Sequence, residues 1–252
     1  MVKIKQLPTR QRVRKALLLL SLLLFPLTLY YFSPALVIQG AFVGIVNGSF
    51  IVFGLMFLSA LCVGRLWCSW ACPAGALQEF GAPINDQRVP RKRLDWIKWA
   101  IWVPWIGLIA AMAVQAGGYR AVDPFYQLDG GLTVFQMDPP WFMVYYVVIA
   151  LFLGLAAVLG RRAGCHTVCW MAPFMILGRR VRNLFRWPAL RLTANEDACI
   201  DCQRCTRACP MSLDVNGMVH TPTMENDECI LCGSCVDTCP ESVIRYTFSG
   251  GR

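Results

Sequence analysis

The sequence predicts an α-helical membrane protein with four transmembrane helices, followed by a small, cysteine-rich α+β domain. The chain of 252 residues is 56% hydrophobic, and its mean hydropathy of +0.48 is too high for an ordinary water-soluble domain. Several long segments carry no charged residue, and eight of the 13 cysteines lie in two matching runs near the C-terminus. These observations predict a membrane domain at residues 1–197 and a separate cysteine-rich domain at residues 198–252.

The uncharged segments are long enough for four membrane helices, each of which needs about 20 apolar residues. Segment 16–64 contains no Asp, Glu, Lys or Arg and can supply two of them. Ser33-Pro34 and Gln39-Gly40 are expected to form the turn between these two, since proline and glycine interrupt helices. Segments 99–119 and 139–160 are each predicted to supply one more helix.

The first apolar segment has the charged start that is typical of a secretory signal. However, no small-x-small cleavage site follows its apolar run at 17–25, and the uncharged segment continues well beyond that run. We therefore expect this segment to be kept as a membrane helix.

Lysine and arginine in the connecting segments predict the orientation, because these residues accumulate on the cytoplasmic side of a membrane. They are frequent before the first predicted helix, after the second and after the fourth, whereas segments 33–40 and 118–138 together hold one arginine. Both termini are therefore expected in the cytoplasm, in a multi-pass protein of the inner (cytoplasmic) membrane. Basic residues beside a lipid bilayer also account for the net charge of +9, so nucleic acid is not an expected partner.

The two cysteine runs both read C-x2-C-x2-C-x3-C-P and are offset by 30 residues. Bacterial ferredoxins use this spacing to hold two [4Fe–4S] clusters, with three close cysteines on one cluster and the fourth on the other. Zinc sites separate their cysteine pairs more widely, and disulfides do not suit the reducing cytoplasm. The predicted ligands are Cys199, Cys202, Cys205 and Cys239 for the first cluster, and Cys229, Cys232, Cys235 and Cys209 for the second.

Other residues of this domain have predicted structural roles. Ile200 and Ile230 follow the first cysteine of each run and are expected to shield the clusters from water. Residues 243–248 are predicted to form a short strand that closes the domain. The mild acidity of the domain suits a basic redox partner protein.

Four more cysteines follow predicted membrane helices as two C-x3-C pairs, Cys68 with Cys72 and Cys165 with Cys169. An i, i+4 pair lies on one face of a helix. Three interpretations stay open. The four thiolates can share a further Fe–S cluster or a metal ion, they can form thiol/disulfide redox pairs, or they can be small buried residues that pack helix ends.

Three tryptophans, Trp67, Trp70 and Trp170, surround these pairs. They fit either an aromatic belt at the membrane interface or the wall of a quinone site. In a quinone site, Arg65 or His166 would hydrogen-bond the carbonyl groups, and His166 can accept a proton when a quinol is oxidised. Haem b is not expected, because no histidine lies within a predicted membrane helix.

With these motifs the chain resembles the NapH-like family of polytopic, ferredoxin-type membrane proteins, which is related to NosR, MauN and RdxA/CcoG. The shared pattern is four membrane helices, a C-x3-C-P motif after the second, a related motif after the fourth, and a two-cluster tail. Cys169 is not followed by proline, so the second motif carries over only for its cysteines. A covalent flavin is not expected, because the large extracytoplasmic flavin domain of NosR-type proteins is lacking.

The resemblance implies electron transfer from the quinone pool, or between cytosolic carriers and a membrane complex, toward a reductase. Two functions fit these observations. The chain can be a membrane-bound electron-transfer subunit between the quinone pool and a partner oxidoreductase, such as a quinol dehydrogenase component without catalytic activity of its own. Alternatively, it can be an assembly or maturation factor that reduces a metal centre of a partner enzyme.

Overall fold

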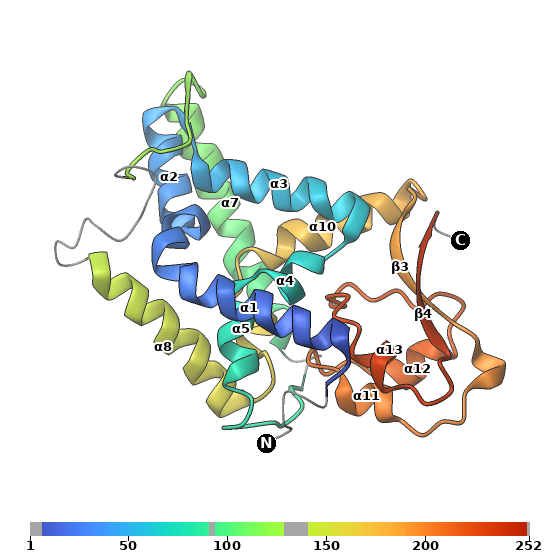
Figure 1. The fold of residues 1–252 in the computed structure, drawn as a ribbon. Helices are drawn as coiled ribbons and strands as arrows, with labels where there is room; N and C mark the ends of the chain where they lie inside the picture. Colours follow the sequence, from blue (N-terminus) through green and yellow to red (C-terminus); the bar gives the residue numbers. More distant parts are fainter. Residues whose placement is uncertain (1–6, 91–93, 129–140, 251–252) are drawn as a thin grey trace.

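The computed structural model describes residues 7–90, 94–128 and 141–250. Figure 1 shows a larger helical part and, beside the N-terminal end of its first helix, a smaller part that contains the last segments of the chain. Some residues that support the predicted topology, namely Lys3, Lys5 and 91–93, lie outside the described residues, as do 139–140 of the last predicted membrane helix.

The helical part begins with three helical segments and a short strand. The longer helices that follow are joined by short helical turns that carry the C-x3-C pairs. In chain order the elements are α1 (Thr9–Thr28), η2 (Leu29–Phe32), α2 (Pro34–Val43), β1 (Ile45–Asn47), α3 (Gly48–Val63), α4 (Leu66–Trp70), α5 (Pro73–Phe80), α7 (Ile97–Gln115), β2 (Ala121–Asp123), α8 (Trp141–Leu159), α9 (Ala163–Thr167) and α10 (Ala172–Leu184).

The turn predicted at Ser33-Pro34 and Gln39-Gly40 was wrong in place. Proline is tolerated at the first position of a helix, and the Ser33 hydroxyl accepts a hydrogen bond from the Leu36 N–H, so α2 starts here. Gln39 and Gly40 lie inside α2, and the chain reverses at Gly44, whose φ of 75° ends the helix. Gly40 instead permits close approach, since a Cβ there would lie 2.6 Å from the Ile45 carbonyl oxygen.

Two helical segments of the described chain are long and apolar enough to cross a membrane, Thr9–Val43 and Ile97–Gln115. Two further apolar helices, Gly48–Val63 and Met143–Leu159, are shorter. At 1.5 Å per residue, the 16 residues of α3 extend about 24 Å, which is less than a hydrocarbon core of about 30 Å.

The smaller part combines short helices with a two-stranded sheet. Its elements are β3 (Ala189–Ala194), η3 (Glu196–Ala198), α11 (Arg204–Ala208), α12 (Val215–Val219), α13 (Ser234–Thr238) and β4 (Ile244–Ser249). Strand β4 confirms the strand predicted at 243–248, and it pairs antiparallel with β3 from Ala189↔Ser249 to Ala194↔Ile244. Strand β3 precedes residue 198, so the sheet includes residues on both sides of the predicted domain boundary.

The two parts share one hydrophobic core. Helix α3 packs against α10 and β3, while α1 packs against α4 and α5. Buried residues of α3 and α10, such as Met56 and Met175, belong to the same core cluster as Ile230 and Leu231 of the second cysteine run. The cysteine-rich part is therefore docked on the helices and contributes to their packing.

Candidate functional site

Four cysteines of the smaller part, which we call the inner cysteines, line one pocket together with Leu192, Met211 and Leu213. Each is at most 8% exposed. Burial raises the pKa of Cys235 well above its ordinary value, and the neighbouring thiols raise it further. The structure thus brings one cysteine of the first run together with three of the second. The inner cysteines are Cys209, Cys229, Cys232 and Cys235.

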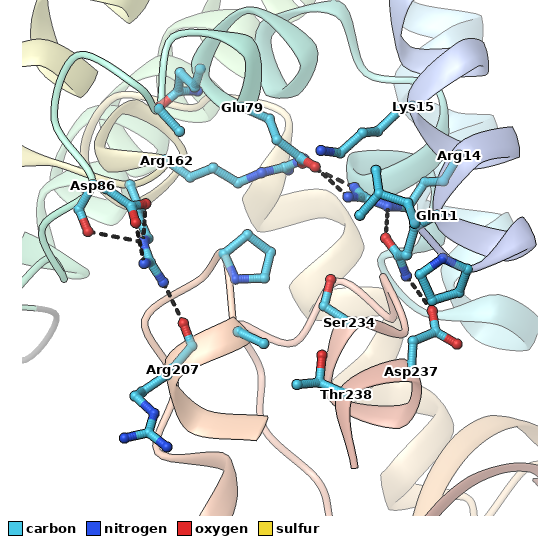
Figure 2. A pocket seen from close by; sticks show the side chains of 17 residues that line it. Gln11, Arg14, Lys15, Glu79, Asp86, Arg162, Arg207, Ser234, Asp237 and Thr238 are labelled. Carbon is cyan, nitrogen blue, oxygen red and sulfur yellow. Dashed lines mark hydrogen bonds and ion pairs between the residues drawn. The ribbon is translucent and has the colours of Figure 1, made fainter. Parts of the chain in front are cut away.

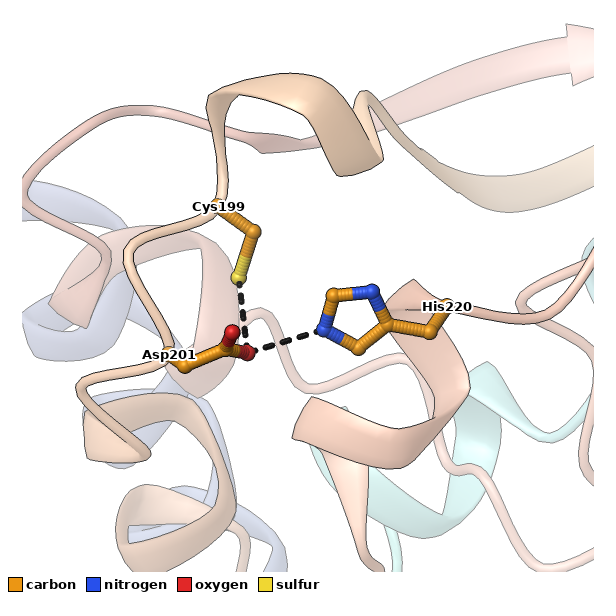
Figure 3. Close-up of side chains that lie close together, drawn as sticks. All are labelled: Cys199, Asp201 and His220. Atoms are coloured by element: carbon orange, nitrogen blue, oxygen red, sulfur yellow. Dashed lines mark hydrogen bonds and ion pairs between the residues drawn. The ribbon is translucent and has the colours of Figure 1, made fainter.

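The other four, the outer cysteines, line a second pocket with Ile200, Asn216 and Val243. Only Cys205 is buried, and the other three are partly exposed. Next to this pocket, Asp201 accepts a hydrogen bond from the Cys199 thiol (3.7 Å) and pairs with the His220 imidazole (2.8 Å), as Figure 3 shows. The outer cysteines are Cys199, Cys202, Cys205 and Cys239.

Both cysteine loops have the same backbone shape. Asp201 and Gln203 of the first run have positive φ, and so do Leu231 and Gly233, which stand 30 positions later. Gln203 and Gly233 each start a five-residue helix, α11 or α13. At Gly233 a side chain would be excluded, because a Cβ there would lie 2.8 Å from the Tyr246 hydroxyl.

The isoleucines of the two runs lie in opposite surroundings. Ile230 is 2% exposed, as expected for a residue that shields a cluster from water. Ile200 lines the pocket of the outer cysteines but is 60% exposed, so it covers that site less completely than Ile230 covers the inner one. The reason lies in tertiary packing: the second run is covered by the helical part, and the first is not.

The loop of the inner cysteines is held by hydrogen bonds from distant elements. Gln11 of α1 donates to the Cys232 carbonyl (3.0 Å), and Arg179 of α10 donates to the Cys229 carbonyl (2.9 Å). Tyr246 of β4 donates its hydroxyl to the Leu231 carbonyl (2.7 Å). These bonds fix the inner loop from both parts of the molecule.

Three glutamates at the junction bind buried basic residues, all but Arg191 of β3 from the helical part. Glu228 pairs with Arg65 (2.7 Å) and Lys98 (2.6 Å). These two positive charges outweigh burial and lower the pKa of Glu228 to about 2. The remaining pairs join Glu79 with Arg14 and Arg162, and Glu225 with Arg179, Arg182 and Arg191.

Positive charge is in excess at this junction. In the described chain, seven buried basic residues share these three glutamates, and Lys98 also lies 3.9 Å from Asp95. Burial and the neighbouring charges of Arg179 and Arg191 lower the pKa of Arg182 to about 10. Buried charge without a partner is unfavourable, so further negative charge is required nearby. A metal cluster held by four thiolates is anionic, and therefore the inner cysteines and their surroundings fit such a group.

A polar cleft lies between α1, α5 and the cysteine-rich part (Figure 2). Glu79 holds Arg162 and Arg14 on one side of it, and Asp237 accepts a hydrogen bond from Gln11 on the other. Pro210 and Ser234, neighbours of the inner cysteines, also line the cleft. The cleft thus borders the segments that carry the inner cysteines.

The two C-x3-C pairs, which the sequence separates by almost 100 residues, lie together. Cys68, Cys72, Cys165 and Cys169 are 4–6% exposed and belong to one core cluster. Burial raises the pKa of Cys72 well above its ordinary value, and the thiols of Cys68, Cys169 and Cys165 add to this effect. Gln78 of α5 donates a hydrogen bond to the Cys165 sulfur (3.3 Å).

The residues predicted to contact quinone lie around these pairs, and several have protein partners. Arg65 is fully buried and bound to Glu228. The fully buried His166 pairs through Nδ1 with Asp95 (2.6 Å). Trp170 donates its indole N–H to the Phe32 carbonyl (2.9 Å). In the described chain, the indole nitrogens of Trp67 and Trp70 and Nε2 of His166 have no hydrogen-bond partner.

Sequence reasoning missed Glu79, Glu225 and Glu228 as organisers of the site, because their partners are far away in the chain. It also missed Arg162, which served only as one of the basic residues that predict the membrane orientation. One signal was present: an arginine precedes each C-x3-C pair by three positions, in R-x2-C-x3-C at Arg65 and Arg162.

Two regions of the chain match known domain families. Residues 45–94, which contain Cys68 and Cys72, match a "4Fe-4S binding domain", and residues 198–244, which contain all eight cysteines of the two runs, match a "4Fe-4S dicluster domain". No solved structure matches the chain.

A curated relative is described as "Putative electron transport protein YccM" from Escherichia coli (strain K12). It is 24% identical over 187 residues, which are 70% of this chain and 48% of the relative. The chain therefore spans about half the length of that protein. With the domain matches, this similarity supports an iron–sulfur electron-transfer role. The finer resemblance to NapH-like proteins stays a prediction.

Proposed function

We propose that this chain is a membrane-bound electron carrier that relays electrons between the quinone pool and a partner oxidoreductase. The observation that carries the proposal is the arrangement of the two four-thiol pockets. One is buried against apolar helices, and the other opens toward water at the far side of the same small domain. A relay needs such a pair, with one site inside the membrane-facing assembly and one accessible to a soluble partner.

Each pocket would hold one [4Fe–4S] cluster, the first on the outer cysteines and the second on the inner cysteines. When bound, such a cluster accepts or releases one electron at a time. The chain's own residues set the surroundings of each site. Ile230, Met211 and Leu213 exclude water from the inner site, while Asp201 and Asn216 leave the outer site in a polar rim. Exposure and hydrogen bonds to sulfur are two factors that separate the reduction potentials of otherwise similar clusters.

We further propose that α1–α2, α3, α7 and α8 cross the membrane, with both termini in the cytoplasm. Each of these helical segments exposes large apolar side chains, for example Leu23, Leu55, Val103 and Val147, at 58–68%. Apolar side chains exposed along four helices are unfavourable in water and favourable in lipid. The helices that fall short of a full bilayer can be accommodated by local thinning.

A quinone site beside Trp67 and Trp70 is supported by their unpartnered indole N–H groups, which can donate to a quinone carbonyl. Both tryptophans lie next to the C-x3-C pair at Cys68. Arg65, two positions before Trp67, pairs with Glu228, which directly precedes Cys229, so a quinone bound there would lie near the inner cysteines. The outer cysteines would then exchange electrons with the partner protein.

The test is reduction of the chain by quinol in lipid vesicles without oxygen. A reduced quinone is expected to bleach the visible absorbance of the clusters. A soluble oxidant protein, added afterwards, is expected to restore that absorbance. The Cys202→Ser variant, which changes only the outer site, should still be bleached by quinol but should pass electrons to the oxidant slowly. Absence of bleaching in a preparation with intact clusters would contradict the quinone relay. In that case, reduction of a partner's metal centre by the chain would favour the maturation role.

A further inference from the structure

We propose that Cys68, Cys72, Cys165 and Cys169 hold a third iron–sulfur cluster, and that Arg65 and Arg162 are its built-in counter-charges. The inference deepens the proposed electron-transfer function and rests on it. The domain match at 45–94 covers one of the two cysteine pairs; the four-cysteine site and the two arginines come from the structure.

The two motifs form an internal repeat with the same backbone hydrogen bonds. Each residue of the motif at Arg65 has a counterpart 97 positions later. The Cys68 N–H donates to the Arg65 carbonyl, as Cys165 does to Arg162, both at 2.9–3.1 Å. The Cys72 N–H donates to the Trp67 carbonyl, and the Cys169 N–H to the Gly164 carbonyl, at 3.0–3.1 Å. The missing proline after Cys169 therefore does not change the backbone of the motif.

The second cysteine of each pair lies at the start of a helix that runs away from the site. Cys72 immediately precedes α5, and Cys169 lies three positions before α10 begins. The backbone N–H groups of Gly75 and Ala172, three positions after these cysteines, are hydrogen-bonded to their sulfurs. Helix starts stabilise negative charge, so both halves of the repeat are arranged for thiolates.

Two buried guanidinium groups have N–H groups without a protein partner beside these sulfurs. Arg65 donates a hydrogen bond from Nη1 to Glu228, and its Nε and Nη2 have no hydrogen-bond partner in the described chain. Arg162 donates Nη1 to the Cys68 carbonyl (2.8 Å) and Nη2 to Glu79 (2.6 Å), which leaves Nε unpartnered. Arg65 acts electrostatically on Cys68 and Cys169, and Arg162 on Cys68 and Cys165.

These arginines separate the interpretations of the four cysteines. Cysteines that merely pack helix ends would be surrounded by apolar groups, since a neutral thiol gives a buried guanidinium only a weak acceptor. Two arginines at 0–1% exposure, with unpartnered N–H groups, instead call for a further acceptor beside the sulfurs, and an anion is the strongest one. Thiolates that bind a metal cluster, and the cluster itself, provide that anion.

The spacing of the sulfurs favours a cluster over a single ion. In tetrahedral zinc sites the zinc–sulfur distance is about 2.3 Å, so the sulfurs are about 3.8 Å apart. Among the described residues, no three of these four sulfurs lie within 4.8 Å of one another. A cluster of several iron and sulfide ions holds its cysteine sulfurs farther apart than a single ion does.

The third site adjoins the inner cysteines. Arg162 acts electrostatically on both Cys165 and Cys232. Glu228, the partner of Arg65, directly precedes Cys229. Leu231, between two inner cysteines, contacts the end of α3, where a Cβ on Gly64 would lie 3.4 Å from it. The third cluster would therefore be the one nearest the apolar helices, next to the inner site.

The test is a count of iron and acid-labile sulfide on full-length protein purified without oxygen, with zinc measured on the same sample. The wild type is expected to hold about twelve irons if the third cluster is a cubane, or about ten if it has two irons. Cys68→Ser combined with Cys165→Ser should lower this to about eight and remove one electron paramagnetic resonance signal. Cys62→Ser, on an exposed cysteine of α3, is the matched control and should change nothing.

About eight irons in the wild type and in the double variant would overturn the third cluster and leave the proposed function intact. Zinc that disappears in the double variant would also overturn it. A wild type with far fewer than eight irons would instead contradict the proposed function itself.

A second measurement tests the arginines. Arg65→Gln should keep the third signal but shift its reduction potential to more negative values, because a positive charge is lost beside the cluster. Arg65→Lys should restore most of the potential. An unchanged potential in Arg65→Gln would show that Arg65 only packs against Glu228.

Discussion

The two cysteine runs of the C-terminal part have the same spacing and the same backbone shape, yet they lie in different surroundings. Ile230 is 2% exposed and Ile200 is 60% exposed at equivalent positions. Leu231 of the second run is buried against α3, whereas its counterpart Asp201 faces water beside His220. The comparison teaches that the spacing arranges four thiols, while the residues between them decide which site faces the helices and which faces water.

The largest expected effect concerns which cysteines act together. Cys209→Ser and Cys232→Ser, from different runs, should each remove about four irons and the same electron paramagnetic resonance signal. Cys239→Ser and Cys202→Ser should both remove the other signal. If Cys209→Ser instead removed the signal that Cys202→Ser removes, each run would hold its own cluster, and the inner and outer sets would be wrong.

The next effect concerns the junction that covers the inner site. Glu228→Ala leaves Arg65 and Lys98 buried without their carboxylate, which should cost about 3–5 kcal/mol of unfolding free energy. The neighbouring Asp227 pairs with Arg180 near the surface, so Asp227→Ala should cost no more than about 1 kcal/mol. Thermal unfolding in detergent without oxygen measures both. Equal shifts in the two variants would show that the junction does not hold the cysteine-rich part on the helices.

The isoleucines provide a matched pair for the same comparison. Ile230→Ala should cost about 2–5 kcal/mol, because it leaves a cavity beside the inner cysteines. Ile200→Ala should change stability by no more than about 0.5 kcal/mol, since the side chain is exposed. The unfolding midpoints of the two variants, each compared with the wild type, measure these two stability changes. A large loss in Ile200→Ala would mean that another protein surface covers the outer site.

The smallest effect is a pH dependence that belongs to Glu228. Its pKa is lowered to about 2 in the folded chain, so the stability that it contributes is full above its unfolded value near 4.5 and declines as pH falls toward 2. The difference in unfolding midpoint between the wild type and Glu228→Gln should therefore shrink as pH falls through this range. Acid loss of the clusters lowers the unfolding midpoint of both proteins equally, so it cancels in the difference between them. A constant difference would contradict the ion pairs with Arg65 and Lys98.

Local patterns in the sequence were enough to predict the strand at β4 and the apolar helices, because both depend on nearby residues. The C-x2-C-x2-C-x3-C-P repeat likewise pointed to which cysteines lie together. The turn near Gly40 was placed wrongly, because a glycine in a helix and a glycine in a turn look alike until the contact with Ile45 is known.

The junction could not be predicted in the same way. Arg65 and Glu228 are 163 positions apart, and no local pattern connects them. The exposure of Ile200 is likewise a result of which run docks on α3. The R-x2-C-x3-C repeat was visible in the sequence, but its meaning depends on the convergence of Cys68 and Cys165.

One site of the cysteine-rich part lies inside the molecule, and the other faces water. Electron paramagnetic resonance of the fully reduced chain, with a water-soluble paramagnetic relaxing agent added, tests this most directly. The account predicts that the agent speeds the relaxation of one ferredoxin-type signal, the signal that Cys202→Ser removes, and leaves the signal of the Cys209 site almost unchanged. Equal effects on both signals, or a stronger effect on the Cys209 signal, would contradict it.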